Sequence, residues 1–386
     1  MRTLYFGVCF FAAAFAAATI LASAEGQVRT YYIAADEVTW NYAPSGIDQV
    51  TGKPFDSMER PYAVQDGHHI GSVYRKAIYR EYTDATFHTL KPRAAADAYL
   101  GFIGPIIHAE VGDTIRVVFR NNASRPYSIH PHGVFYAKNS EGMTYNDGSA
   151  QAGKMSGAVP PGQTYTYTWE VPERAGPGPN DPSSIVWLYH SHVDEQKDID
   201  SGLVGAIIVT ARGMANPDGT PKDVDRELVA VFHIVNENQS WYFNENIATY
   251  TPKLKRAQRA EAIGVDENNA FTLNGSGFAD GNFKFSINGY VYGNGPRMVM
   301  TQGQRVRWYV IAIGNGFDFH TPHWHGNTVL WNKQRTDVLA LMPAQMVTVD
   351  MVPDDPGLWL FHCHVADHMD AGMTAFYQVL PSGALP

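Results

Sequence analysis

Thirteen residues near the C-terminal end, FHCHVADHMDAGM (361–373), contain three histidines, one cysteine and two methionines. Packing alone does not explain this composition, because a buried imidazole needs hydrogen-bond partners. All three residue types bind metal ions. A thiolate with two histidines and a more distant methionine is the ligand set of a blue-copper site, which transfers single electrons. The segment therefore predicts a copper site.

Further groups of histidines extend this pattern. Ten of the fifteen histidines lie in four short clusters: His130 and His132; His190 and His192; His320, His323 and His325; His362, His364 and His368. Alternate residues of a β-strand point to the same face, so each His-x-His pair projects two imidazoles side by side. The four pairs suit copper far better than calcium or magnesium, and they exceed the needs of a zinc site. The other histidines are predicted to be ordinary structural residues: His68, His69, His88, His108 and His233.

The first 24 residues have the pattern of a secretory signal peptide. They contain Arg2, an apolar run and the small-residue site ASA at 22–24, after which a signal peptidase cuts. We therefore expect a secreted or periplasmic protein, with retention of the segment as a membrane anchor as the alternative. Of the two cysteines, Cys9 would be removed, and Cys363 would remain alone, without a partner for a disulfide within the chain. No later stretch is apolar for long enough to span a bilayer.

Strand signals dominate the rest of the sequence. Short segments rich in β-branched and aromatic residues are bounded by Gly, Pro, Asn or Asp, and they predict strands at 30–40, 114–121, 164–171, 203–210, 305–313 and 346–352. Many short strands with turn residues between them indicate an all-β protein made of Greek-key β-sandwiches. The formal net charge of −9 argues against nucleic acid and anionic membrane surfaces as partners.

The sequence also repeats itself. Residues 104–121 match residues 295–312, and the HPHG segment at 130–133 falls where the second copy has HWHG at 323–326. Two tandem sandwich domains are therefore expected. We place them at 25–212 and 226–386, with the Gly/Pro/Asp-rich segment 213–225 as a linker.

The four histidine clusters resemble a family signature. In order they are HxHG, HxH, HxxHxH and HCHxxxHxxxxM, which is similar to the four-part signature of the multicopper oxidases. The segments 31–46, 76–87 and 104–121 resemble the ceruloplasmin and hephaestin branch, whose domains are cupredoxin-like. The resemblance covers nearly the whole chain after the signal segment. Relatives on that branch carry six such domains in one polypeptide, whereas this chain carries two.

The resemblance implies a role for each ligand. The blue (type 1) copper would be held by His320, Cys363 and His368, with Met373 as a long axial ligand. The type 2 copper would take His130 and His323. One type 3 ion would take His132, His190 and His364, and the other would take His192, His325 and His362. About four copper ions per chain are thus implied, and the bonded unit His362, Cys363 and His364 would carry electrons between the type 1 site and the three-copper cluster.

The first domain lacks part of this set. Tyr127 stands where the second domain has His320, and Ser191 stands where it has Cys363. We therefore expect no type 1 site in the first domain.

The implied activity is that of an oxidase, which takes single electrons from a reducing substrate and reduces O2 to two waters. Asp147 would be a carboxylate near the type 2 copper, or else a residue of a plain Asx-turn. Asp367 matches an aspartate that helps to bind Fe2+ in ceruloplasmin-like relatives, and Asp280 matches a second iron ligand, but Phe285 replaces a histidine. Because two-domain relatives are more often laccase-like, phenol oxidation ranks first and Fe2+ oxidation (ferroxidase activity) second.

Two other classes of protein share parts of this pattern. Copper nitrite reductases also have two cupredoxin domains, but their catalytic copper needs only three histidines. A non-catalytic copper-binding module tends to lose ligands, whereas the second repeat retains the full set. Copper content distinguishes the three classes, with about four ions per chain for the oxidase, two for the reductase and one or none for the module.

The two-domain organisation leads to one further expectation, a homotrimer with its three-copper clusters between subunits. Six-domain relatives close a ring so that the first and last domains meet. Three copies of a two-domain chain would supply the same six domains by head-to-tail association, which gives a closed ring when the rotation per subunit fits.

Overall fold

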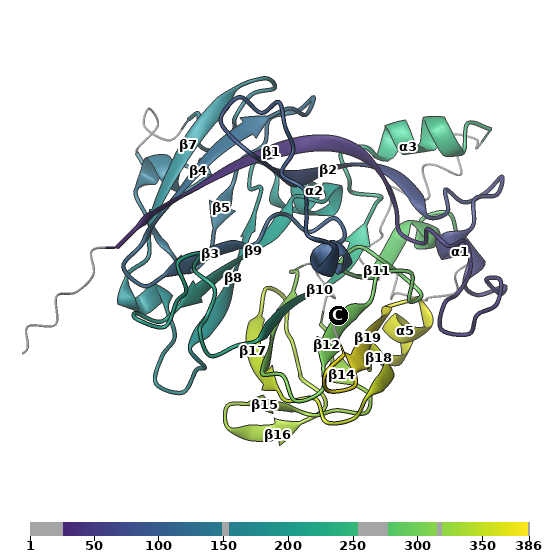
Figure 1. The fold of residues 1–386 in the computed structure, drawn as a ribbon. Helices are drawn as coiled ribbons and strands as arrows, with labels where there is room; N and C mark the ends of the chain where they lie inside the picture. Colours follow the sequence, from purple (N-terminus) through teal and green to yellow (C-terminus); the bar gives the residue numbers. More distant parts are fainter. Residues whose placement is uncertain (1–25, 149–153, 254–276, 315–318, 385–386) are drawn as a thin grey trace, which may run out of the picture.

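The computed structural model describes residues 26–148, 154–253, 277–314 and 319–384 (Figure 1). The predicted signal peptide lies outside these residues. The first half contains β1 Val28–Asn41, β2 Val73–Tyr82, β3 Ile107–Glu110, β4 Thr114–Asn121, β5 His130–Pro131, β6 Phe135–Tyr136, β7 Thr164–Glu170, β8 Ser184–His190 and β9 Val204–Thr210. The second contains β10 Arg226–Asn236, β11 Phe283–Ile287, β12 Met298–Thr301, β13 Val306–Ala312, β14 Pro322–Trp324, β15 Val329–Trp331, β16 Gln334–Thr336, β17 Met346–Met351, β18 Gly357–Cys363 and β19 Thr374–Leu380.

The helices are short. The α-helices are α1 Arg60–Ala63, α2 Glu195–Ser201, α3 Phe243–Tyr250 and α5 Ala366–Asp370. The 3-10 helices are η1 Ala95–Leu100, η2 Lys138–Ser140, η3 Glu173–Ala175 and η4 Asp280–Asn282. Each predicted strand segment coincides with an observed strand to within two residues at either end. The predicted all-β fold class is confirmed.

Each half of the chain forms two sheets with the same strand order. The first half has sheets β2-β1-β4-β7-β6 and β3-β9-β8-β5. The second has β11-β10-β13-β17-β15-β16 and β12-β19-β18-β14. The parallel pairs also correspond, since β1 with β4 matches β10 with β13, and β3 with β9 matches β12 with β19. The repeat seen in the sequence is therefore a repeat of topology, with β5 and β14 as the equivalent end strands.

Burial along the strands distinguishes the outer surface from the contact between the halves. In β4 the side chains of Ile115, Val117 and Phe119 are buried while alternate residues are not, as expected for a sheet with one solvated face. All seven residues of β13 are buried. The reason is that the first half covers the outer face of β13, where Arg307 Nη1 donates to Ser184 Oγ at 2.8 Å.

The contact between the halves also contains a buried ion pair. Lys76 of β2 and Glu237, just after β10, are both fully buried, with 2.5 Å between Nζ and Oε1. Tyr42 OH donates to the same carboxylate oxygen at 2.6 Å. Because removing one partner of such a pair leaves a buried charge uncompensated, these contacts fix how the halves sit against each other.

The segment between β1 and β2 crosses from the first half to the second. Its Phe55 ring lies 5.3 Å from the ring of Tyr292. Tyr292 in turn donates its backbone N–H to the carbonyl of Gly372 at 2.8 Å, next to Met373. Residues of the first half therefore support the loop that carries the predicted axial ligand.

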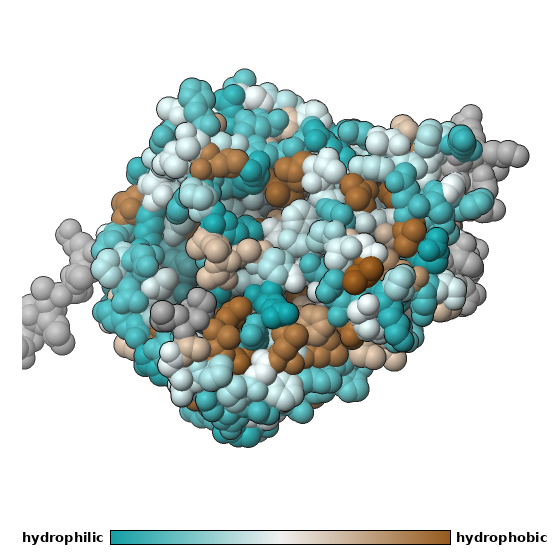
Figure 2. Space-filling model, turned by 45° about the vertical axis from the view of Figure 1, so that its right-hand side comes forward, coloured by the Kyte–Doolittle hydropathy of each residue, from teal (hydrophilic) through white to brown (hydrophobic). Residues whose placement is uncertain are grey.

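Figure 2 shows hydrophobic side chains in small separate groups among hydrophilic ones on the face it presents. No helix in the described part of the chain is both long enough and apolar enough to cross a membrane.

Candidate metal centre

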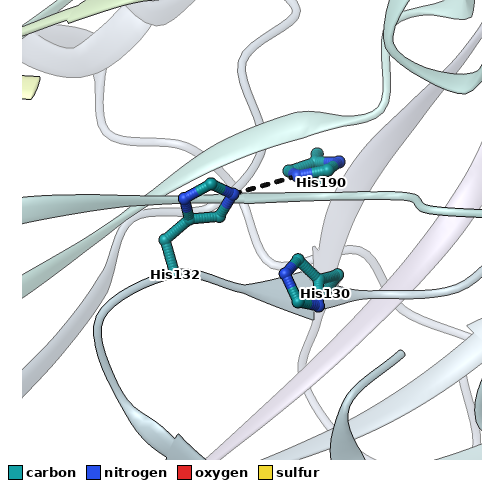
Figure 3. A group of neighbouring side chains, drawn as sticks. All are labelled: His130, His132 and His190. Carbon is teal, nitrogen blue, oxygen red and sulfur yellow. Dashed lines mark hydrogen bonds between the residues drawn. The ribbon is translucent and has the colours of Figure 1, made fainter. Parts of the chain in front are cut away.

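Four histidines of the first half converge at the end of the sheet β3-β9-β8-β5. His130 of β5 lies directly opposite His190 of β8, and their rings face His132 (Figure 3). The Nε2 atoms of His132 and His190 are 3.1 Å apart, close to the roughly 3.3 Å expected for two nitrogens on one ion with bonds of about 2.0 Å. His192 completes the group, with its ring 5.1 Å from that of His130.

The second half repeats this arrangement. His323 of β14 lies opposite His362 of β18. The Nε2 atoms of His325 and His362 are 3.0 Å apart, and His323 Nδ1 lies 3.2 Å from His362 Nε2. The ring of His364 is 5.1 Å from that of His323. We name these two groups the first and second histidine sets; they contain His130, His132, His190 and His192, and His323, His325, His362 and His364.

Backbone carbonyls orient several of these imidazoles. His130 Nδ1 lies 2.6 Å from the carbonyl oxygen of Glu141, and His190 Nδ1 lies 3.0 Å from that of Ser191. His362 Nδ1 lies 2.8 Å from the carbonyl oxygen of Cys363. Since a carbonyl only accepts, Nδ1 carries the proton in each ring and Nε2 presents a lone pair. Metal-binding histidines are held in this way.

Burial keeps three of these histidines, His132, His190 and His362, neutral. It lowers the pKa of His132 to about 4, with help from the neighbouring His130 and His192. It also lowers the pKa of His362 to about 4. The pKa of His190 is lowered well below its ordinary value, again chiefly by burial. Neutral imidazoles are the form that binds metal, so protons compete for these nitrogens only in acid.

Cys363, His320 and His368 form a third group on the other side of β18. The Cys363 Sγ lies 3.8 Å from His320 Nδ1 and 3.6 Å from His368 Nδ1, near the roughly 3.5 Å expected for sulfur and nitrogen on a shared ion. All three residues are buried. Met373 is fully buried too, and its carbonyl accepts the N–H of Cys363 at 3.1 Å.

The surroundings of Cys363 favour the thiolate. Burial alone would raise its pKa, but His320, His368 and the N–H of Thr321 outweigh this effect and lower the pKa to about 6. The thiol is therefore largely ionised at neutral pH. Because neighbouring residues of a strand face opposite ways, one peptide segment joins this thiolate to His362 and His364.

The two histidine sets do not meet within the chain. Among the described residues, every hydrogen bond and ring contact between members of these sets stays inside one set, and each convergent group of metal-binding atoms comes from one half. Each set lies where the end strand of its sheet pairs with its neighbour, β5 with β8 or β14 with β18. Every cluster ion predicted from the sequence takes ligands from both sets, so the single chain brings together only part of each predicted ligand group.

Hydrogen bonds fill the position in the first half that corresponds to the Cys363 group. Ser191 Oγ donates to Asp198 Oδ2 at 2.6 Å, and the Tyr127 and Tyr242 hydroxyls are 3.2 Å apart. Burial raises the pKa of Asp198 to about 6, and Trp241 Nε1 donates to its other oxygen at 2.8 Å. A segment of the second half thus inserts into this position, which the sequence did not predict.

Asp147, the predicted carboxylate near the type 2 copper, is linked to the first histidine set through other residues. Its Oδ2 lies 2.9 Å from Lys138 Nζ, and the same nitrogen lies 2.7 Å from Glu141 Oε2. Glu141 is the residue whose carbonyl orients His130. The catalytic role of Asp147 remains a prediction.

Two carboxylates that the sequence did not single out lie close to the histidine sets. Glu195 Oε2 is 3.5 Å from His192 Nε2. Asp337 Oδ2 is 3.7 Å from His323 Nε2. The three-residue spacing of His192 and Glu195 in the segment HVDE hints at the first contact, but no local pattern connects Asp337 with His323.

The predicted iron residues lie around His368. Asp367 is exposed on α5, directly before His368. The ring of Phe285 lies 5.3 Å from that of His368. The phenyl ring of Phe285 therefore covers the buried His368 imidazole, at the position where the sequence analysis expected a histidine iron ligand.

Comparison with known proteins identifies the family of this chain. Models of the family described as "Multicopper oxidase" match residues 81–213 and 262–383. Among curated relatives, "Ferroxidase HEPHL1" of Homo sapiens is 43% identical over 354 residues, covering 91% of this chain and 29% of the relative. Hephaestin of Homo sapiens is 40% identical, covering 94% and 30%, and ceruloplasmin of Mus musculus is 38% identical, covering 92% and 31%.

The chain thus spans about three tenths of the length of these relatives. Solved structures agree in fold. A crystal structure of a multicopper oxidase has a TM-score of 0.55 at 20% identity, covering 91% of this chain and 89% of its own. The blue copper oxidase of Nitrosomonas europaea has a TM-score of 0.52 at 17% identity, covering 92% and 86%. With its two cupredoxin-like halves, its thiolate group and its paired histidine sets, the chain belongs to the multicopper oxidase family.

Proposed function

We propose that this protein is a ferroxidase, which oxidises Fe2+ and reduces O2 to water. The observation that carries the proposal is the arrangement on β18, where Cys363 faces His320 and His368 while its neighbours His362 and His364 belong to the second histidine set. Copper bound at these groups supplies the one-electron chemistry that couples a one-electron donor to O2. The spacing of the donor atoms and the neutral imidazoles fit that metal.

The ligand roles follow the assignment made from the sequence. His320, Cys363 and His368 would hold the type 1 copper, with Met373 as axial ligand. The two histidine sets would hold the type 2 ion and the type 3 pair, for a total of about four ions per chain. Within each set the chain contributes orientation, since the carbonyls of Glu141, Ser191 and Cys363 fix which imidazole nitrogen faces the metal.

Fe2+ replaces phenol as the first-ranked donor. Phenol ranked first in the sequence analysis because two-domain relatives are more often laccase-like. Relatives named as ferroxidase and hephaestin match over 91% to 94% of this chain at about 40% identity, which favours iron. Four Fe2+ give up one electron each, and with O2 and four protons they yield four Fe3+ and two waters.

Oxygen uptake with Fe2+ compared with 2,6-dimethoxyphenol tests this choice. We expect kcat/KM for Fe2+ to exceed that for the phenol by more than about tenfold, which corresponds to roughly 1.4 kcal/mol of differential transition-state binding. A kcat/KM that favours the phenol by more than about tenfold would instead support the laccase-like function.

Met373→Leu tests the axial ligand. The variant is expected to keep the blue absorption and to show a higher reduction potential, because loss of a weak thioether donor destabilises Cu(II) relative to Cu(I). Redox titration followed at the blue band measures the shift. Met369→Leu is the matched control, since Met369 is exposed on α5. A fall in potential, or loss of colour, in Met373→Leu would contradict the assignment.

The assembled enzyme is proposed to be a homotrimer with its three-copper clusters between subunits. The two histidine sets lie on separate strand pairs of one chain, β5 with β8 and β14 with β18, and each set alone is half of the predicted cluster. Head-to-tail contact would bring the first set of one subunit against the second set of the next. Export through a signal peptide at 1–24 remains part of the proposal, with a secreted or periplasmic location.

A further inference from the structure

The loop that follows β6 gathers three acceptors around one lysine. Lys138 Nζ lies 2.7 Å from Glu141 Oε2 and 2.9 Å from Asp147 Oδ2, and it also donates to the hydroxyl of Tyr145. The same ammonium lies 4.0 Å from the centroid of the Tyr145 ring. These acceptors, Glu141 first, raise the pKa of Lys138, so the side chain stays charged at neutral pH. One cation therefore holds two carboxylates and a phenol in one loop.

The Glu141 part of this loop reaches His130. The carbonyl oxygen of Glu141 lies 2.6 Å from His130 Nδ1, and a carbonyl only accepts, so Nε2 keeps its lone pair for a metal. The next residue, Gly142, has a φ of 77°, and a Cβ at this position would overlap the carbonyl of Ile129. The backbone of the loop is therefore in close contact with the backbone just before His130.

Contacts with β7 hold the middle of the loop. Tyr165 OH donates to the carbonyl of Asn139 at 2.7 Å, and Trp169 Nε1 donates to the carbonyl of Ser140 at 2.9 Å. Both donors belong to β7, so the η2 turn is attached to the sheet. Lys138 adds the remaining contact, since it holds the Glu141 side chain at its charged end.

Loss of the Lys138 charge would act on His130 through Glu141. The carboxylates of Glu141 and Asp147 approach the same nitrogen, so they lie close together, and without the ammonium their negative charges would repel each other. A single exposed ion pair contributes little. Although 44% of the Lys138 side chain is exposed, its two partners are only 11% and 18% exposed, and partly buried charges are screened less. Movement of Glu141 would withdraw the carbonyl that orients His130.

The other proposed type 2 ligand is held in a different way. His323 Nδ1 lies 3.2 Å from His362 Nε2, so it faces an imidazole rather than a carbonyl. His130, by contrast, lies beside His132 and His190 (Figure 3) with its Nδ1 on the Glu141 carbonyl. The orientation of the type 2 ligands is therefore expected to depend on the loop that contains Lys138.

We infer that Lys138 is a positioning residue for the type 2 copper and acts through Glu141 on His130. The inference rests on the proposed role of His130 as a type 2 ligand. The hydrogen-bond partner of a ligating histidine fixes its tautomer and ring orientation, and loss of such support weakens metal binding by about 10- to 100-fold. Because the Cys363 group lies in the second half, we expect an effect on the type 2 site and none on the type 1 site.

Lys138→Met tests the inference, because methionine keeps an unbranched side chain and removes the charge. In the copper-loaded protein, we expect a changed hyperfine splitting of the type 2 signal in electron paramagnetic resonance. Competition with a chelator should show Cu2+ at that site bound about 10- to 100-fold more weakly, with the blue absorption unchanged. Glu141→Gln keeps the backbone carbonyl but removes the charge that pairs with Lys138, so it should change both readouts in the same direction. Lys138→Arg keeps the charge and should retain the wild-type signal.

Lys91→Met is the matched control, because Lys91 is also an exposed lysine of the first half, 2.9 Å from Glu81 Oε1. It should leave the type 2 signal and the Cu2+ affinity unchanged. Wild-type signal and affinity in both Lys138→Met and Glu141→Gln would overturn the inference, as would equal losses of type 1 and type 2 copper in both. His130→Ala separates this failure from failure of the proposed function, since a type 2 signal that persists in His130→Ala would reject the ligand assignment itself.

Discussion

Cys363→Ser is expected to abolish both the blue absorption and the oxidation of every donor. The Cys363 Sγ faces His320 and His368, and its pKa of about 6 makes it a thiolate at neutral pH. A serine hydroxyl stays protonated and cannot supply the charge-transfer band or the electron path into β18. Absorption spectra, oxygen uptake and copper analysis measure the three consequences.

The same variant should keep the fold and the remaining copper. Serine is close to cysteine in volume, so the expected cost is that of one buried hydroxyl, roughly 1–3 kcal/mol. Copper content should fall by about one ion per chain, since Cys363 belongs to neither histidine set. Activity at the wild-type level would exclude Cys363 as the electron-accepting ligand and with it the whole assignment.

A mixture of His130→Ala and His323→Ala chains is expected to regain oxidase activity that neither variant has alone. Each substitution removes a proposed type 2 ligand from one histidine set. In a head-to-tail trimer, an intact first set from a His323→Ala chain meets an intact second set wherever the next chain is His130→Ala. Random mixing at equal amounts makes about one quarter of the interfaces intact. Oxygen uptake after subunit exchange or co-expression measures the recovery.

A mixture of His130→Ala with His132→Ala is the control, because both changes lie in the first set and no interface becomes intact. Sedimentation should give a mass near three times that of the chain, and removal of copper should weaken the assembly, since ions that bind only the assembled state stabilise it. A monomer that is fully active at high dilution would place the whole cluster within one chain and reject the trimer.

The fold class and most of the metal-binding residues follow from local patterns. The alternation of buried and exposed residues in segments such as β4 identifies strands, because side chains alternate between faces. The same alternation explains why His130 and His132, or His323 and His325, project together. A duplicated pattern also predicts a duplicated topology, and the matching strand orders of the two halves confirm it.

The sequence could not determine contacts between residues far apart in the chain. Whether the two histidine sets meet depends on how the two halves pack against each other. Buried contacts between the halves, such as Lys76 with Glu237 and Arg307 with Ser184, determine that packing. Residue types and periodicity predict which groups bind metal, since both are local properties. Only the tertiary structure decides which of them share an ion, because that depends on packing between segments that no local pattern relates.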